Sequence, residues 1–255
     1  NLSLLHDVTT GRYIPGPEAD TSVFLRYVEY IVQNGHLMTV DCMRYFPWCY
    51  GSTFGGNMDE YSFLSYFIAY LYKFWHFFNS SITVQYAHVM YPVISFVIAL
   101  VFFFLLVKKL FDYKIALLAS AFLTLVPAYL HRTMAGFSDK ESLGFVFMFA
   151  AFYFFVCAWQ DKDLRKNIMF GVLSGLATGL MGLVWGGFNF VIVTIGIFVL
   201  LEVLLDRTDE KNSYAYISWF LFFVIFMFIF KRWDLSVLVG GVYSAITSFA
   251  FVMIL

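Results

Sequence analysis

Long apolar runs separated by short polar connections make up most of the chain after the first 60 residues. A helix needs about 20 apolar residues to cross the hydrocarbon core of a membrane. The runs that approach this length lie near residues 84–107, 115–131, 142–159, 167–184, 188–205, 213–230 and 236–255. The pattern therefore predicts an all-α fold, a polytopic transmembrane helical bundle in which Trp185-Gly186-Gly187 separates two helices of a hairpin.

The segment 61–78 leaves two interpretations open. It is rich in aromatic residues, but Lys73, Trp75 and His76 interrupt it, and these side chains favour the membrane–water interface. The segment is either a further spanning helix or an amphipathic helix that lies on the membrane surface.

Basic residues predict the orientation of the bundle. The connections after residues 107, 159 and 205 hold most of the Lys and Arg residues between predicted spans. Cytoplasmic loops carry such an excess, so these connections are expected inside. Residues 131–141 and the 185–187 turn then share the outer face.

Composition supports a membrane protein and argues against other classes. Hydrophobic residues make up 61% of the chain and charged residues 13%, with a mean hydropathy of +0.77. Soluble domains carry about 25% charged residues. The net charge of −1 argues against nucleic-acid binding, which needs a clustered basic surface. Cys42 and Cys49 can pair if their stretch faces an oxidising compartment, and two unpaired thiols are the alternative.

An acidic connection on the predicted outer face is the main candidate for chemistry. Residues 132–142 read Arg-Thr-Met-Ala-Gly-Phe-Ser-Asp-Lys-Glu-Ser, which places Asp139 and Glu141 beside Arg132 at the mouth of a helix. Ionisable residues at a membrane edge indicate a functional site. The alternative is a capping box with Ser138 as N-cap and Glu141 reaching back to it. Both interpretations hold if Asp139 points to a cation while Glu141 caps. Residues two apart on a helix diverge by about 200°, so one ion is not expected to be held equally by both.

This acidic segment resembles the second acidic motif of the oligosaccharyltransferase catalytic-subunit family. That motif runs Arg, Ser or Thr, hydrophobic, small, Gly, two variable positions, Asp, any residue, and an acidic or polar residue. The resemblance implies that Asp139 ligates a divalent metal ion, that Glu141 lies close to it, and that Arg132 neighbours both carboxylates.

A weaker resemblance covers residues 18–26, which correspond to the family's first acidic motif. The segment keeps an Asp and an Arg six positions later, but it lacks the Pro and the aromatic pair of archaeal members. The resemblance implies that Asp20 is another metal ligand, with Glu18 as the alternative, and that Arg26 contacts the lipid phosphate. Residues 44–48 and 179–187 also resemble archaeal members.

The resemblance implies a topology as well. Asp20 and Asp139 must lie on the same side of the membrane to share a metal ion, so 61–78 is expected on the outer surface. Residues 1–83 then form the first outer loop, and 84–255 form a GT-C-type bundle of seven spans. The family's first helix would precede Asn1. A third metal ligand and an acceptor-binding domain would follow Leu255, so the chain is expected to be a fragment or half of a split enzyme.

The implied function is an inverting oligosaccharyltransferase. It transfers a glycan from a dolichol-type lipid (pyro)phosphate to Asn in Asn-x-Ser/Thr, and all-oxygen ligands suit Mn²⁺ or Mg²⁺. The expected partners are the lipid-linked donor, the acceptor polypeptide and the bilayer, with no nucleic acid. The active face is expected on the extracytoplasmic side, at the plasma membrane if the protein is archaeal. The alternatives are another membrane glycosyltransferase with a lipid-phosphate sugar donor, and a non-catalytic scaffold or transporter.

Two short patterns have simpler interpretations. Gly171, Gly175 and Gly179 recur every four residues, which predicts a face for close helix packing. Asn79-Ser80-Ser81 matches the acceptor pattern for glycosylation, a triplet common enough to occur by chance.

Overall fold

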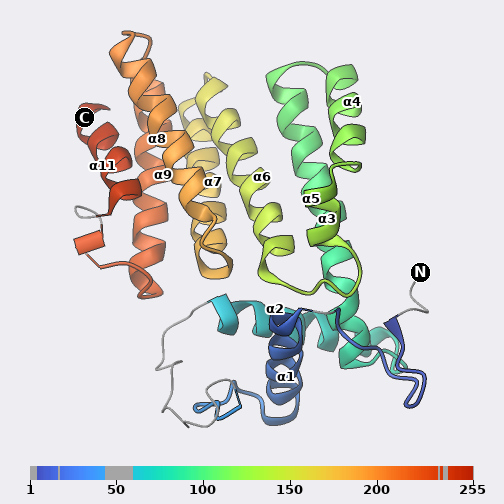
Figure 1. Ribbon diagram of the computed structural model, residues 1–255. Helices are drawn as coiled ribbons and strands as arrows, with labels where there is room; N and C mark the ends of the chain where they lie inside the picture. The colour runs from blue at the N-terminus through green and yellow to red at the C-terminus, as the bar shows by residue number, and fades with distance from the viewer. Residues whose placement is uncertain (1–4, 17, 44–59, 235, 238–240, 255) are drawn as a thin grey trace. The chain divides into compact units, whose positions relative to one another are not determined.

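The fold is helical throughout the described part of the chain. The computed structural model describes residues 5–16, 18–43, 60–234, 236–237 and 241–254. These residues form no strand, and their β-type pairing is limited to a bridge between His6 and Tyr13. The predicted all-α fold class is confirmed. The chain divides into two compact units, one of residues 1–97 with 124–143 and one of residues 98–123 with 144–255 (Figure 1).

The first unit contains α1 (Ala19–Asn34), α2 (Glu60–Phe78), the beginning of α3 (Val84–Leu110) and α5 (Pro127–Thr133). Helix α1 buries one stripe of side chains, and this apolar face explains why the segment folds as a helix packed on α2. The stripe consists of Thr21, Phe24, Tyr27, Val28 and Ile31. The helix ends at Gly35, whose φ of 81° is readily available only to glycine.

Helix α2 coincides with the segment whose membrane placement the sequence left open. Leu64 and Ile68 are fully buried, whereas Tyr70, Phe74 and Phe77 are 60–84% exposed. A helix with a buried side and an exposed aromatic side suits the membrane-surface interpretation. That placement, like the predicted division of the chain at residue 83, stays a prediction about the membrane.

Four described helices are long and apolar enough to cross a membrane. They are α3, α6 (Lys140–Gln160), α7 (Leu164–Val184) and α9 (Glu210–Ile229). Helices α8 (Phe188–Leu204) and α11 (Val242–Ile254) are shorter, and α4 (Tyr113–Leu123) passes the same test only together with α5. The predicted count of seven spans therefore stays a prediction.

The segment 115–131 differs from the single span that the sequence predicts. The helix is interrupted between Leu123 and Pro127, and α5 begins at that proline. A proline disfavours the helical conformation in the residue before it, and Val126 is accordingly extended, with φ −68° and ψ 114°. Uniform hydropathy along the segment hides this interruption.

Close contact between α7 and α9 organises the second unit (Figure 1). The predicted glycine face lines this contact, and Gly175 lies against the backbone of Trp219. The indole nitrogen of Trp219 donates to the Thr178 hydroxyl at 3.0 Å, and this hydroxyl donates to the Ser174 carbonyl at 2.8 Å. Small residues and hydrogen bonds between helices are the usual means of association in a bilayer.

Replacing Gly175 by Ala is expected to destabilise this contact. The added Cβ would lie 2.6 Å from the Trp219 carbonyl oxygen and 3.0 Å from the Phe222 Cβ, and a backbone oxygen cannot rotate away. We expect a loss of about 1–3 kcal/mol, measured by thermal unfolding of the purified protein in detergent. Gly186→Ala is the control, because nothing lies within 4 Å of the Cβ that it adds. Equal unfolding temperatures for both variants would contradict the packing argument.

The two described cysteines differ in their chemical state. Cys42 is disulfide-bonded, whereas Cys157 is a free, buried thiol. Cys49 lies outside the described residues, as does the segment 44–48 that resembles archaeal members.

Candidate functional site

The acidic connection after α5 is fastened to the backbone of α3. Gly136, with φ 86°, donates from its N–H to the Val89 carbonyl at 3.0 Å. The Ser138 hydroxyl donates to the His88 carbonyl at 2.6 Å. The Gly136 carbonyl in turn accepts from the Gly16 N–H at 2.7 Å, which brings the start of α1 to this connection.

Pro92 explains why the His88 carbonyl is available to Ser138. In a regular helix the carbonyl of His88 would accept from the N–H of residue 92, but proline has no N–H. Ser138 therefore supplies the missing donor, and its side chain is fully buried at this point. One turn along, the Tyr91 hydroxyl donates to the backbone oxygen of Asp139. A proline inside an apolar run thus provides the docking point for the acidic motif.

A double-variant cycle tests this docking. Ser138→Ala leaves the buried His88 carbonyl without that donor, so we expect a loss of about 1–3 kcal/mol in stability. Pro92→Ala restores an N–H at the helical position, so the double variant is expected to lose less than the sum of the single variants. Thermal unfolding in detergent measures the stability of the two single variants and of the double variant.

The control for this cycle is Ser120→Ala. It removes a buried hydroxyl that makes no hydrogen bond, so stability should stay within about 0.5 kcal/mol. Strict additivity of Ser138→Ala and Pro92→Ala would show that the two residues act independently and would contradict the docking argument.

Three carboxylates converge on one arginine. The Nη1 atom of Arg132 lies 3.6 Å from Glu18 Oε2, 3.8 Å from Asp139 Oδ2 and 3.5 Å from Glu141 Oε1. The guanidinium also lies over the Phe137 ring, 5.0 Å from its centroid. These N–O distances exceed those of good hydrogen bonds, so the contacts are mainly electrostatic. The structure therefore brings together Arg132, Asp139 and Glu141 as predicted, with Glu18 as a fourth member.

The predicted divergence of Asp139 and Glu141 is wrong. Helix α6 begins at Lys140, whose N–H donates to Asp139 Oδ1 at 2.7 Å, so Asp139 precedes the helix. The 200° separation applies only to two residues that both lie in a helix. The predicted capping box with Ser138 as N-cap is also wrong, because α6 begins at Lys140 and Asp139, not Ser138, directly precedes the helix.

Asp20 lies beside the acidic connection but pairs with a different cation. Its Oδ2 atom is 3.6 Å from Lys140 Nζ, and its side chain is 44% exposed. Lys140 separates the two acids of the motif, and its contact with Asp20 could not be predicted from the sequence. Its ammonium group links the start of α1 to the start of α6.

Arg26, the predicted phosphate contact, makes a bidentate ion pair with Asp41. Its Nη1 and Nη2 atoms lie 2.6 and 2.5 Å from the two carboxylate oxygens, and the Tyr27 hydroxyl donates to the same carboxylate at 2.5 Å. The Asp41 side chain is fully buried. Sequence reasoning missed Asp41, although it is the only acidic or basic residue between Glu29 and Arg44 apart from a histidine.

The carboxylate oxygens of this site are suitable ligands for a hard divalent cation, but they do not form a complete coordination site. Among the described residues, no group of three or more His, Cys, Asp or Glu side chains is placed to hold a metal ion. However, the Oε2 atom of Glu141 is buried and has no hydrogen-bond partner. A buried carboxylate oxygen is costly unless it is satisfied, and an oxygen-ligated cation would satisfy it. Asp139 and Glu141 are the residues that would hold such an ion.

The family model and the related proteins match different lengths of this chain. The family described as "Oligosaccharyl transferase STT3, N-terminal" matches residues 11–255. The dolichyl-diphosphooligosaccharide–protein glycosyltransferase subunit STT3 of Saccharomyces cerevisiae is 30% identical over 113 residues, which is 44% of this chain and 15% of the yeast protein. The dolichyl-phosphooligosaccharide–protein glycotransferase of Methanococcus voltae is 26% identical over 213 residues, 76% of this chain and 23% of that protein.

Solved structures share the fold. The oligosaccharyltransferase AglB of Archaeoglobus fulgidus, in complex with an inhibitory peptide and a dolichol-phosphate, superimposes with a TM-score of 0.73 at 19% identity, covering 98% of this chain and 31% of AglB. The same archaeal enzyme in complex with Zn and sulfate gives a TM-score of 0.69 at 22% identity, with 96% and 30% covered.

The chain thus spans less than a quarter of these two curated relatives and less than a third of the solved enzyme. The family match, in contrast, extends over nearly the whole chain and confirms the resemblance that residues 132–142 carry. The chain belongs to the oligosaccharyl transferase STT3 family and corresponds to the amino-terminal part of its members.

Proposed function

We propose that the native protein transfers an oligosaccharide from a lipid (pyro)phosphate to the asparagine of Asn-x-Ser/Thr segments. Family membership and the names of the relatives support this activity. One archaeal structure holds dolichol-phosphate, and another is tethered to an acceptor peptide with an NVT sequon. The observation that carries the proposal for this chain is the convergence of Glu18, Asp139 and Glu141 on Arg132 around a buried, unpartnered oxygen of Glu141.

The reaction needs what such a site offers. An asparagine amide is a poor nucleophile, and the leaving lipid (pyro)phosphate is anionic. A divalent Mn²⁺ or Mg²⁺ ion held by Asp139 and Glu141 would supply neutralising charge at the leaving group. Arg132 holds the carboxylates together and presents a guanidinium, a good partner for phosphate oxygens. Displacement from the opposite side would invert the sugar carbon.

Asp20 is proposed as a further metal ligand that moves into place. The Asp20 Oδ2 atom lies 3.6 Å from Lys140 Nζ, and the Asp20 side chain is 44% exposed. Exposed pairs of this kind contribute about 0–1 kcal/mol, so the pair does not hold Asp20 firmly. A divalent cation would compete successfully for the carboxylate. Arg26, in contrast, would have to leave a bidentate pair to contact a phosphate.

We place the site on the extracytoplasmic face of a multi-pass membrane protein, at the plasma membrane if the protein is archaeal. The excess of Lys and Arg in the connections after residues 107, 159 and 205 supports this orientation. The aromatic surface of α2 supports a position at the bilayer surface.

Metal removal tests the proposed function. Native membranes are given a lipid-linked donor and a fluorescent peptide that contains Asn-x-Thr, with a Gln-x-Thr peptide as the control. We expect chelation to stop transfer to the Asn peptide and Mn²⁺ or Mg²⁺ to restore it, with no transfer to the Gln peptide. Undiminished transfer after thorough chelation would overturn the metal-dependent mechanism, and absence of transfer with metal present would overturn the activity.

A further inference from the structure

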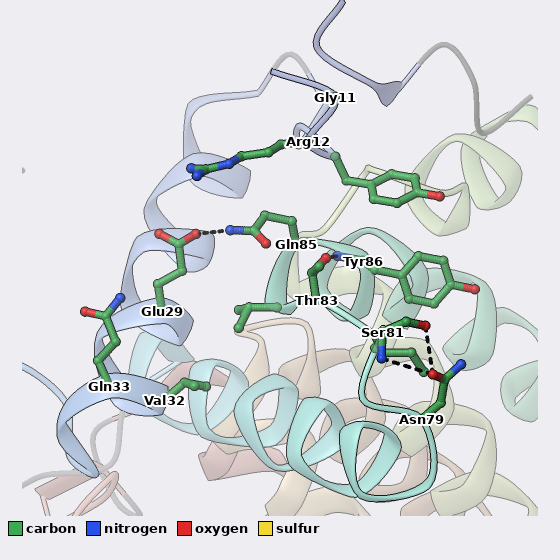
Figure 2. A pocket seen from close by; sticks show the side chains of 13 residues that line it. Gly11, Arg12, Glu29, Val32, Gln33, Asn79, Ser81, Thr83, Gln85 and Tyr86 are labelled. Atoms are coloured by element: carbon green, nitrogen blue, oxygen red, sulfur yellow. Dashed lines mark hydrogen bonds between the residues drawn. The ribbon is translucent and has the colours of Figure 1, made fainter. Parts of the chain in front are cut away.

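The turn between α2 and α3 contains an exposed acceptor pattern for glycosylation. Asn79, Ser80 and Ser81 are all exposed. The Asn79 Oδ1 atom accepts from the backbone N–H of Ser81 at 3.0 Å and from its hydroxyl at 2.7 Å. Figure 2 shows the amide nitrogen of Asn79 on the side away from Ser81. The nitrogen that would take a sugar is therefore not used by the turn.

The helix α3 is long enough to place this turn beyond the hydrocarbon core of a membrane. The helix has 27 residues and is about 40 Å long, whereas the hydrocarbon core is about 30 Å thick. Lys108 and Lys109 mark its other end. If the basic end lies at the cytoplasmic surface, the end near Val84 projects about 10 Å beyond the hydrocarbon on the outer side.

A polar cavity beside the turn has room for sugar rings. Its volume is about 800 Å³, and Asn79 and Ser81 lie on one side of it, with Glu29 and Gln33 on another (Figure 2). Ligand cavities in proteins usually measure about 300–1,000 Å³. The cavity beside Asn79 is therefore large enough for the first part of an attached glycan.

The lining of this cavity suits a ligand rich in hydroxyl groups. The Gln85 amide donates to the Glu29 carboxylate at 2.6 Å, and Arg12 lies beside them (Figure 2). Tyr13 and Tyr86 line the same cavity, and their rings lie 5.4 Å apart. Charged and amide groups bind hydroxyls, and aromatic rings cover the apolar faces of sugars.

The short turn that presents Arg12 is held by an aspartate. Asp7 accepts from the Thr10 hydroxyl and from the hydroxyl and N–H of Thr9 at 2.6–2.9 Å. These hydrogen bonds, that of the Thr10 side chain first, lower the pKa of Asp7 to about 2. The hydrogen bonds that Asp7 accepts in this turn therefore persist into acidic solution, because its carboxylate stays ionised there.

We propose that Asn79 is itself a glycosylation site, with room along this cavity for the first sugars. The inference rests on the proposed function, since it needs transfer to Asn-x-Ser/Thr on the outer face. In that reaction the Asn79 nitrogen forms a bond to the sugar C1 and loses one proton to a base. The C1–O bond to phosphate breaks, and the oxygen leaves with the electron pair as the lipid (pyro)phosphate. The acceptor turn is exposed, so opening it for an enzyme copy costs little.

The test is the mass of the peptide that contains Asn79, from full-length native protein purified from its own membranes. We expect a glycan on Asn79 in the wild type and in Ser80→Ala and Ser81→Thr, which keep the acceptor pattern. We expect none in Asn79→Gln or Ser81→Ala, and the second of these keeps the asparagine. An unmodified wild-type peptide, or a glycan that persists in Ser81→Ala, would overturn the inference.

The same cells separate this inference from the proposed function. Asn-x-Thr sites of other secreted proteins are analysed in parallel. If these sites carry glycans while Asn79 is bare, the inference fails and the proposed function stands. If no such site carries a glycan, both fail.

Discussion

The Asp139→Asn variant is expected to transfer glycan about 10²–10³-fold more slowly than the wild type, a typical cost of removing one electrostatic contact to a transition state. Asparagine has the size of aspartate and keeps an oxygen that accepts from the Lys140 N–H, so the start of α6 should be preserved. Only the negative charge beside Arg132 and Glu141 is lost. Initial rates are measured with the full-length protein, a lipid-linked donor and an Asn-x-Thr peptide at several Mn²⁺ concentrations.

The matched control is Glu210→Gln. Glu210 lies exposed in the first turn of α9 and accepts only a long hydrogen bond of 3.2 Å from the Tyr214 hydroxyl. Its removal also takes away one carboxylate, but far from the acidic connection in the sequence, and the rate should not change. A rate for Asp139→Asn within about twofold of the wild type would remove Asp139 from the proposed mechanism.

The Arg26→Ala variant is expected to lose about 2–4 kcal/mol of stability. Breaking a buried ion pair by removal of one partner costs about 3–5 kcal/mol, and the 27% exposure of the Arg26 side chain reduces that figure. The Asp41 carboxylate would stay buried after losing two hydrogen bonds of 2.6 and 2.5 Å. The combined Arg26→Met and Asp41→Leu variant should lose less, since no charge remains to be buried. Thermal unfolding in detergent compares the two.

Arg165→Ala is the control for this prediction, because Arg165 is exposed at the start of α7. It should change stability by no more than about 0.5 kcal/mol. If Arg26→Ala is as stable as this control but binds the lipid donor more weakly, Arg26 contacts the lipid phosphate and does not stabilise the fold. That result would favour the role that the resemblance implies over the structural role.

Sequence patterns predicted the ends of helices best where a local feature, such as a pair of glycines, interrupts the apolar run. The hairpin of 167–184 and 188–205 matches α7 and α8 closely, because Trp185-Gly186-Gly187 interrupts the apolar run. The break at Pro127 was missed, since average hydropathy does not fall there. The aromatic segment 61–78 matches α2, because the polar residues Asn79, Ser80 and Ser81 follow it directly and form a turn.

The candidate site was predicted only where its residues are close in the chain. Arg132, Asp139 and Glu141 lie within ten positions, and the motif groups them. Ser138 and His88 are 50 positions apart, and the role of Pro92 depends on a carbonyl that no sequence pattern reveals. Tertiary contacts of this kind decide how the carboxylates are oriented. Asp139 and Glu141 converge on Arg132 because Asp139 precedes α6, whose start the sequence pattern placed one or two residues too early.

The most direct test of the central claim is a titration of the purified full-length protein with Mn²⁺, followed by electron paramagnetic resonance of the free ion. The proposal predicts one tightly bound Mn²⁺ in the wild type and in Glu210→Gln. It predicts that this site is lost in the variant that combines Asp139→Asn with Glu141→Gln. Equal binding by the wild type and the double variant would show that these carboxylates do not hold the metal ion, and would contradict the proposed site.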